Sequence, residues 1–449
     1  DEQPKLPRVP LDELGSTGLL RHGGMVAEEF LSQLSGTRGV KIYREMADND
    51  PIIGSLLFVI DMMLRRVSWH VETESSATEN EQAAAFLREC MTDMSTSWED
   101  LISEIMSMLQ YGWSFHEVVY KKRDGDVRNP QHRSKFTDGR YGWRKLPIRG
   151  QDTLQEWEFD ESGGVRSMTQ QAPPDYKTIK IPLGRALLFR TRTHKGNPEG
   201  RSILRNSYRP WYFKRRIEEI EGMGIERDLA GLPVMWVPPE ILDSQASTEE
   251  RALLAAIKKI VRNVRRDNQE GAILPLAYNE GGQRKYIFEL LSSGGLRQFD
   301  TSGVIYRYNE AIMMTALADF VLLGHEGYGS YALSADKTNM FELALDAWSQ
   351  MVASVFNSHA IPRLLKINGL SGRCKMRPGR VERVNLAELG AFITNMAGVG
   401  AISVDSKLED FLRQVAKLPQ RDEDSVRPQQ RKPDEVDEYD STTEEGVDE

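Results

Sequence analysis

The stretch that decides the fold is Ile225-Glu-Arg-Asp-Leu-Ala-Gly-Leu-Pro-Val234, because a helical pattern stops there and a strand pattern begins. Residues 199–230 contain few helix breakers and predict one long helix or a broken pair of helices. Gly231-Leu232-Pro233 ends that helix, since proline has no amide hydrogen with which to continue helical hydrogen bonding. Leu232–Val237 then predicts a strand.

A small α/β unit follows this boundary. Its pattern predicts an amphipathic helix over Ser247–Arg266, with further strands at Ala272–Leu276 and Tyr286–Leu291. A second long helix is predicted over Phe299–Leu323, with a length of about 37 Å at about 1.5 Å per residue. The sequence therefore places a small α/β unit between two long helices.

The first half of the chain mixes both kinds of element. Lys41–Arg66 is helical in pattern, and Asp48–Pro51 either breaks this helix or caps a second one. Val67–Glu74 and Phe115–Lys122 predict strands, and the apolar spacing after Trp98 predicts a helix that Gly112 ends. The remaining elements are short strands at Trp157–Asp160, Tyr176–Pro182 and Ala186–Arg190, and a third long helix at Thr338–Phe356. We therefore expect an α+β fold.

The two ends of the chain differ from the middle in composition. Pro4, Pro7 and Pro10 predict an N-terminal arm with little helix over residues 1–39. Residues 421–449 hold 12 acidic and 4 basic residues and few apolar ones, which predicts a disordered tail. The full chain of 449 residues has a net charge of −9, of which this tail contributes −8. The acidic total therefore says nothing against a nucleic-acid partner for the rest of the chain.

Motifs for bond chemistry are missing from the sequence. No Gly-x-x-x-x-Gly-Lys-Ser/Thr loop is present, and Gly324-His-Glu-Gly-Tyr-Gly follows a helix rather than a strand, which predicts a mobile loop. His116 and Glu117 are neighbours on a predicted strand, so they point to opposite faces and cannot act together. Two cysteines, Cys90 and Cys374, are too few for a disulfide scaffold or a cysteine-rich metal site. We predict no catalytic residue, no cofactor and no metal, and hence no enzyme.

Two groups of basic residues could carry a binding function. The first lies on one side of the Ser247–Arg266 helix and consists of Lys258, Lys259, Arg262, Arg265 and Arg266. The second consists of Arg201, Arg205, Arg209, Lys214, Arg215 and Arg216. Either group can be an ordinary solvated face, or can contact DNA, a partner protein or another copy of the chain.

Several segments resemble those of bacteriophage portal proteins, the head–tail connectors, and most closely the Mu-like portal family. The segments are Asp50–Val71, Leu109-Gln-Tyr-Gly-Trp-Ser-Phe-His-Glu-Val-Val119, Tyr208-Arg-Pro-Trp-Tyr-Phe-Lys-Arg-Arg216 with Ile225–Val234, and Asn357–Leu365. Their order and spacing carry the resemblance, which extends over about residues 40–418.

The resemblance implies a portal-type fold and a ring oligomer of 12 subunits. It divides the chain into an N-terminal arm (1–39), a wing (40–198), a first stem helix (199–230), a clip (231–296), a second stem helix (297–323), a tunnel loop with a wing helix (324–384), a crown (385–420) and the acidic tail (421–449). The tunnel-loop residues would be Gly324, His325, Glu326, Gly327, Tyr328, Gly329, Ser330 and Tyr331. The first basic group would be a docking surface or a tunnel wall in the clip.

The function implied by the resemblance is that of a portal at one capsid vertex of the virion, assembled in the host cytoplasm. Its implied partners are double-stranded DNA, which passes through without sequence-specific contacts, terminase, the major capsid or scaffolding protein, and a head–tail adaptor. No membrane is implied, since the apolar stretch Pro51–Leu64 is too short to span a bilayer. Two alternatives remain open: a nucleic-acid-processing enzyme with an unrecognised active site, and a non-viral protein-binding scaffold.

Overall fold

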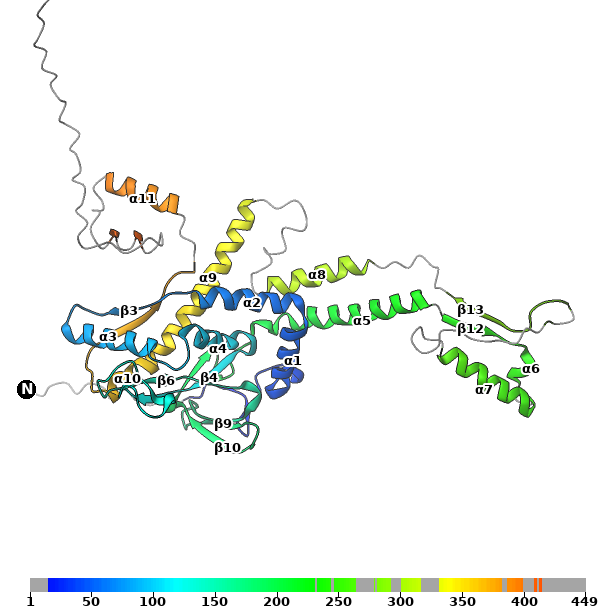
Figure 1. The fold of residues 1–449 in the computed structure, drawn as a ribbon, viewed down its shortest axis with the longest axis horizontal. Helices are drawn as coiled ribbons and strands as arrows, with labels where there is room; N and C mark the ends of the chain where they lie inside the picture. The colour runs from blue at the N-terminus through cyan, green and yellow to red at the C-terminus, as the bar shows by residue number, and fades with distance from the viewer. Residues whose placement is uncertain are drawn as a thin grey trace, which may run out of the picture. The chain divides into compact units, whose positions relative to one another are not determined.

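The computed structural model describes residues 15–230, 232–243, 246–263, 278, 281–291, 300–315, 331–381, 386–398, 408–409 and 412–413 (Figure 1). The chain divides into two compact units, residues 1–381 and 382–449. In the second unit, the structure places helix α11 at Leu386–Gly398. The larger unit holds all the other helices and strands named below.

The helices of the larger unit are α1 (Gly36–Asn49), α2 (Pro51–Arg65), α3 (Thr78–Thr92), α4 (Trp98–Tyr111), α5 (Tyr208–Ala230), α6 (Pro239–Leu242), α7 (Thr248–Asn263), α8 (Thr301–Met314), α9 (Tyr331–Val355) and α10 (Ile361–Ile367). Its strands are β1 (Arg21–His22), β2 (Met25–Val26), β3 (Trp69–Thr73), β4 (Trp113–Glu117), β5 (Val119–Lys122), β6 (Tyr141–Lys145), β7 (Ile148–Arg149), β8 (Leu154–Phe159), β9 (Val165–Gln171), β10 (Thr178–Pro182), β11 (Ala186–Arg190), β12 (Leu232–Trp236), β13 (Ile287–Leu291) and β14 (Cys374–Pro378). The prediction of a mixed helix and sheet fold is confirmed.

The corner between α1 and α2 is set by Asp50. Its carboxylate accepts hydrogen bonds from the backbone amides of Ile52 and Ile53 at 2.9 and 3.1 Å, and Pro51 occupies the first helical position. An N-cap carboxylate followed by proline is a strong helix start. The two sequence alternatives for this site are thereby resolved, because Asp50 caps a second helix.

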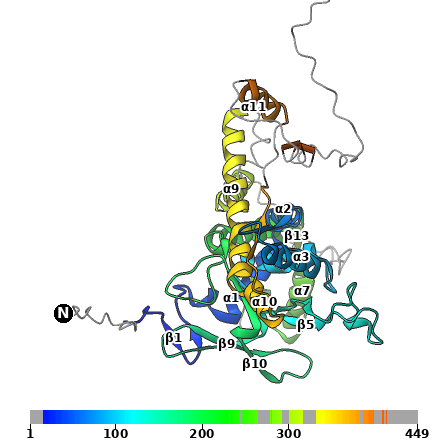
Figure 2. The ribbon, with the colours of Figure 1, turned by 90° about the vertical axis from the view of Figure 1, so that its left-hand side faces the viewer.

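The main hydrophobic core joins segments that are far apart in the sequence. It contains buried side chains of α2, α3 and α4 together with those of α9, α10 and β14. Figure 2 shows α9 running as one long helix toward α10, with a π-helical turn at Phe356–Ala360 between them. The ring of Phe356 lies 6.0 Å from that of Trp143 and 5.7 Å from that of Phe189. The chain after residue 331 therefore completes the core that the first 190 residues begin.

Small antiparallel sheets cover this core. The strands pair in the orders β11-β4-β7, β10-β9-β8, β14-β3 and β5-β6. A second hydrophobic cluster lies between the first two of these sheets, where the rings of Trp113 and Trp157 are 5.0 Å apart. The strand β9 was not foreseen from the sequence.

The prediction of one strand over Phe115–Lys122 is wrong. The segment forms β4 and β5, which are separated at Val118 and pair in different sheets. Val118 is buried and its amide donates to the carbonyl of Arg185, which turns the chain out of the first sheet. Apolar residues continue across the break, so the sequence pattern gives no sign of it.

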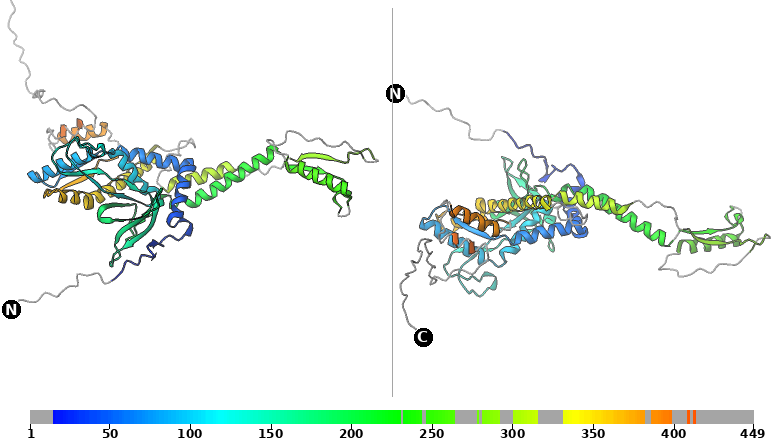
Figure 3. Two further views of the ribbon diagram at one scale, coloured as in Figure 1. Left: turned by 60° about the horizontal axis from the view of Figure 1, so that its bottom comes forward. Right: turned by 90° about the horizontal axis from the view of Figure 1, so that it is seen from above.

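The helices α5 and α8 lie side by side, as Figure 3 shows, and a small unit follows α5 in the chain. In that unit β12 pairs antiparallel with β13, and α7 contacts β12. The helix predicted over Phe299–Leu323 corresponds to α8, which ends at Met314. The hydroxyl of Thr315 donates to the carbonyl of Ile312 at that end. Residues 316–323 and the predicted strand Ala272–Leu276 lie outside the described residues.

Candidate functional site

The pair formed by α5 and α8 is joined by aromatic and polar contacts. The rings of Phe213 and Tyr308 are stacked at 6.5 Å with an interplanar angle of 19°. Farther along the pair, Thr301 donates its hydroxyl hydrogen to the carboxylate of Glu221. Farther along α5 than Phe213, two apolar side chains are open, with Ile220 61% and Met223 50% exposed. The pair is thus held together by these contacts and still leaves apolar surface uncovered.

The second basic group, residues 201–216, is largely neutralised within the chain. Arg205 donates two hydrogen bonds to the carboxylate of Glu29, at 2.7 and 2.6 Å. Arg215 forms ion pairs with Glu45 and Glu219, and Glu219 also pairs with Arg216. Arg205 and Arg215 thus fasten the start of α5 to other parts of the chain, whereas the Arg216–Glu219 pair lies within α5. Contact of this group with DNA, a partner or another copy stays a prediction.

Lys214 makes the deepest of these contacts. Its side chain is 2% exposed, and its ammonium lies 2.9 Å from the carboxylate of Asp50, which is 4% exposed. The other oxygen of that carboxylate caps α2. A single carboxylate therefore both starts α2 and holds α5 against it. Removal of the Lys214 charge would leave Asp50 buried without its ion-pair partner, whereas removal of Asp50 would leave Lys214 with Glu218 at 3.9 Å.

The first basic group lies partly in the described chain. Lys258 and Lys259 are exposed on α7, while Ile257 is 6% exposed and so lies on the buried side of this helix. Arg262 belongs to α7, and Arg265 and Arg266 lie outside the described residues. Of the residues predicted for the tunnel loop, 324–330 also lie outside them, and Tyr331 is the first residue of α9. The roles assigned to both sets stay predictions.

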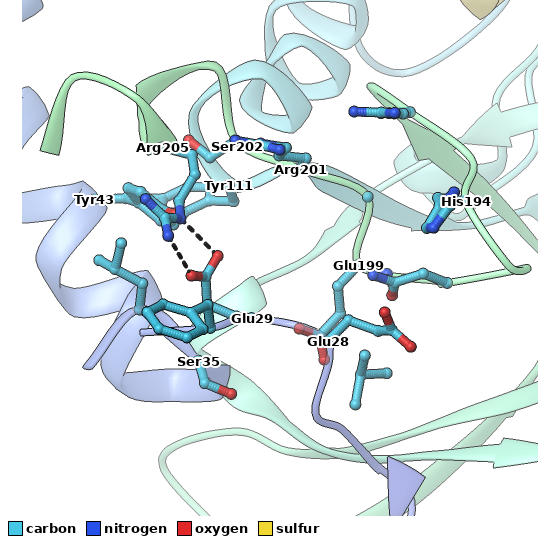
Figure 4. Close-up of a pocket in the computed structure, with 16 residues that line it drawn as sticks. Glu28, Glu29, Ser35, Tyr43, Tyr111, His194, Glu199, Arg201, Ser202 and Arg205 are labelled. Carbon is cyan, nitrogen blue, oxygen red and sulfur yellow. Dashed lines mark hydrogen bonds and ion pairs between the residues drawn. The ribbon is translucent and has the colours of Figure 1, made fainter. Parts of the chain in front are cut away.

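A cavity of about 420 Å³ opens beside the start of α5, between the N-terminal arm and residues 192–205 (Figure 4). The arm is fixed on one side of it by two adjacent carboxylates. Glu28 pairs with Lys195 at 3.2 Å, and Glu29 pairs with Arg205. The pKa of Glu28 is lowered, first by the hydrogen bond from the amide of Leu20 and then by Lys195. Desolvation would raise the pKa of Glu29, but the hydrogen bonds from Arg205 and the amide of Leu31 outweigh it and lower the pKa. Sequence reasoning missed this cavity, since its walls come from four separate segments.

Glu199 is the carboxyl group of this cavity that has no ion pair with a described residue. The indole of Trp157 donates to its Oε1 at 3.2 Å, and desolvation raises its pKa from 4.5 to about 7. The segment that carries Glu199 crosses directly over Gly112, which has φ +95°. A Cβ at Gly112 would lie 2.4 Å from the carbonyl oxygen of Glu199, so glycine is required for this close approach.

The described residues give no catalytic constellation. His116 is fully buried, its Nδ1 lies 2.9 Å from the carbonyl of Leu146, and burial lowers its pKa to about 4. Glu117 instead pairs with Arg149. Burial raises the pKa of Cys90 to about 12 and that of Cys374 to about 11. Within the described ranges no cluster of three or more His, Cys, Asp or Glu side chains has metal-binding geometry.

Comparison with known protein families gives a match over most of the chain. A family described as the portal protein of Mu bacteriophage matches residues 40–411. The chain belongs to this portal protein family. The family assignment confirms the resemblance seen in the sequence and identifies the chain as a phage portal protein.

Comparison with solved structures gives matches at low sequence identity. The chain is similar to one from the "Virion of native gene transfer agent (GTA) particle", with 12% identity, 85% of this chain and 94% of that chain covered, and a TM-score of 0.49. It is similar to an HK97 family phage portal protein from Corynebacterium diphtheriae, with 10% identity, coverage of 75% and 94%, and a TM-score of 0.39. Among the described helices of the portal protein, none is long and apolar enough to cross a membrane.

Proposed function

We propose that the portal protein assembles into a closed ring of 12 copies at one capsid vertex and forms the channel for DNA packaging and ejection. In this proposal α5 and α8 are the stem, the unit of β12, β13 and α7 is the clip, and α11 belongs to the crown. The clip docks terminase during packaging and a head–tail adaptor afterwards. The outer surface contacts the major capsid or scaffolding protein.

The observation that carries the proposed ring is the apolar surface that the α5–α8 pair leaves open. Ile220 and Met223 are three residues apart on α5, so they share one side of the helix and are both half or more exposed. Two helices cannot enclose a hydrophobic core by themselves, and a third surface must cover this side. Neighbouring copies in a ring supply that surface to every subunit, whereas a monomer leaves it in water.

The charge distribution supports a channel that does not hold DNA. The chain without residues 421–449 has a net charge of −1. Most of the basic residues at 201–216 already have carboxylate partners. Each phosphate contact adds affinity and would slow a moving duplex, so a wall of neutralised arginines and lysines favours passage over retention.

The mass of the native assembly tests the proposal. We expect a species of twelve times the 51.0-kDa chain mass, with a central hole in electron micrographs. Ile220→Asp places a charge on the open side of α5 and should abolish that species. Ile179→Asp is the matched control, because Ile179 is 52% exposed on β10 and away from α5. A wild-type chain that stays monomeric with capsid or scaffolding protein present would refute the ring.

A further inference from the structure

A groove of the larger unit, at the junction of α10 and the start of β14, has no role in the proposed ring and channel. Its volume is about 540 Å³, which is within the size range of ligand sites. Ile361, Pro362 and Leu365 of α10 line it together with Leu370 of the turn that follows. Residues 371–375 complete its lining. Apolar side chains and the backbone of a strand thus surround one space.

The pairing of β14 with β3 decides which way the backbone of β14 points. The amide of Glu74 donates to the carbonyl of Arg373, and the amide of Gly379 donates to the carbonyl of Ser68. Both bonds continue the antiparallel register of the two strands. Hydrogen bonds alternate along an antiparallel pair, so the odd-numbered residues of β14 bond to β3 and the even-numbered residues point their amides and carbonyls away from it. The backbone of Cys374 therefore points to the open edge of β14.

Met376, the next residue whose backbone points outward, already has a partner. The side-chain amide of Asn357 donates to the carbonyl of Met376 at 2.9 Å and accepts from its amide at 2.8 Å. It thus bonds both backbone groups, as a residue of a neighbouring strand would. The amide and carbonyl of Cys374 have no such partner among the described residues, and Cys374 lines the groove. An open pair of backbone groups at a groove is a place where a further strand can bind.

The open edge is held in place by α3. The amide of Arg373 donates to the side-chain carbonyl of Asn80 at 2.7 Å. The hydroxyl of Ser371 donates to the carboxylate of Glu79 at 2.9 Å. A Cβ at Gly372 would lie 2.1 Å from the carbonyl oxygen of Glu79, so the chain passes directly against α3. The open backbone is therefore preformed, which favours binding because the site need not be ordered by its ligand.

The charges around the groove are mostly positive. Lys366, Arg373 and Lys375 line it and are exposed, and Glu74 is the one carboxylate of the lining. That carboxylate lies 3.0 Å from the ammonium of Lys375 and 3.8 Å from the guanidinium of Arg373. Lys366 is exposed on α10 and has no ion pair with another described residue. Three cations and one carboxylate leave a net charge of +2, which favours an acidic ligand.

From these observations we propose that the groove binds an extended segment of a partner protein as a strand added antiparallel to β14. One residue of this segment exchanges two hydrogen bonds with Cys374, because directly opposed residues of antiparallel strands can bond through both their amides and their carbonyls. Opposed residues also share a face of the sheet, so this residue points to the buried face, as Cys374 does, and is apolar.

The neighbours of that residue in the segment point to the exposed face, where Arg373 and Lys375 lie. Opposite charges on adjacent strands attract, so acidic side chains are favoured at these positions. The site therefore selects a segment in which apolar and acidic residues alternate. The proposal goes beyond the ring and the channel, and it does not depend on the number of subunits.

Three labelled peptides test the added strand by fluorescence anisotropy with the full-length protein. The parent is a heptapeptide in which valine alternates with glutamate. N-methylation of its valine amides removes the donors that would face Cys374, and N-methylation of its glutamate amides removes donors that would face away. We expect saturable binding of the parent, about 10-fold weaker binding of the first methylated peptide, and a change below about 2-fold for the second. No saturable binding of the parent up to about 1 mM overturns the proposal, as do equal affinities of the two methylated peptides.

Variants of the groove test the same contacts from the protein side. Cys374→Pro removes the outward amide hydrogen, and Pro378 already occupies a position of β14 with the same orientation, so no hydrogen bond to β3 is lost. Lys366→Glu reverses an exposed charge of the groove, and Lys41→Glu is the matched control on α1. We expect the parent peptide to bind about 10-fold more weakly to the first variant and about 5-fold more weakly to the second, with no change for the control. Equal binding by the wild type and Lys366→Glu overturns the selection of acidic segments, whether or not Cys374→Pro folds.

Two further measurements decide what occupies the groove. Chains that lack residues 421–449 are expected to bind the parent peptide as the full-length chain does. Tighter binding after this deletion shows that the acidic tail fills the groove, and overturns its assignment to a partner protein. Assembled rings are expected to bind as much peptide per chain as unassembled chains. Loss of binding on assembly shows that a neighbouring copy covers the groove, and overturns that assignment as well.

Discussion

Replacement of Glu199 by glutamine should stabilise the protein, and by an amount that depends on pH. Glu199 accepts a hydrogen bond from the indole of Trp157, and a glutamine carbonyl at the same place can accept the same bond. The glutamine side chain has almost the same shape but does not ionise. The variant therefore removes only the cost of holding a carboxylate in a desolvated cavity.

The magnitude follows from the shift in pKa. Burial raises the pKa of Glu199 from 4.5 to about 7 in the folded protein. Each unit is worth about 1.36 kcal/mol, so the largest cost is about 3 kcal/mol. Glu199 is an acid whose pKa is raised in the folded protein, so its ionisation lowers the free energy of unfolding. This loss of stability is absent below pH 4.5, grows between pH 4.5 and 7, and is constant above pH 7. Glu199→Gln should match the wild type at pH 4.5 and exceed its free energy of unfolding by up to about 3 kcal/mol at pH 8.

Urea denaturation at a series of pH values measures this difference. Glu161→Gln is the control, because it makes the same chemical change at a glutamate that is exposed to solvent. A gain that is the same at pH 4.5 and pH 8 would mean that ionisation of Glu199 is not its source. A loss of stability at pH 8 would refute the reasoning, because it would show that the carboxylate is needed in its charged form.

Three further predictions concern the attachment of α5 and the proposed docking and channel surfaces. Lys214→Met should lower the free energy of unfolding by about 3–5 kcal/mol, because Asp50 would be left buried without its ion-pair partner. In the same urea denaturation assay, adding Asp50→Asn to this variant should recover part of the loss. Lys258→Glu with Lys259→Glu should leave the native mass of the ring unchanged and weaken its binding to terminase or adaptor, and unchanged binding would identify these lysines as an ordinary solvated face. Deletion of Gly327–Ser330 should keep ring assembly and reduce DNA packaging or retention, whereas loss of the ring would place these residues in the subunit interface.

The sequence predicted those helix ends that depend only on residues close by in the chain. Asp50 was expected to break or cap a helix, and the structure shows the cap because its carboxylate needs only the next three residues. Gly112 was expected to end a helix, and it does so with a positive φ. The break at Val118 was missed, since it depends on a hydrogen bond from its amide to the carbonyl of Arg185, which lies in the turn before β11. A pattern of alternating residues holds no information about which sheet a strand joins.

The candidate surfaces were harder to predict for the same reason. Arg205 and Lys214 are members of a basic run in the sequence, but their partners Glu29 and Asp50 are 176 and 164 residues away. A run of like charges thus looks available for DNA until its distant carboxylates are placed. The cavity beside Glu199 was likewise invisible, because the arm, α1, α4 and residues 192–205 each provide part of its wall.

In the proposed ring, the neutralised run would let one helix serve both its own attachment and the passage of DNA. Lys214 binds Asp50 beneath α5, and Asp50 starts α2, so the direction of α5 is tied to the corner of the main core. Arg215 pairs with Glu45 of α1, and Arg216 pairs with Glu219 on α5 itself. The residues that fix the helix are therefore those whose free charge would otherwise attract a duplex. In the proposed ring, firm attachment of α5 and weak affinity of its surface for DNA are two consequences of the same ion pairs.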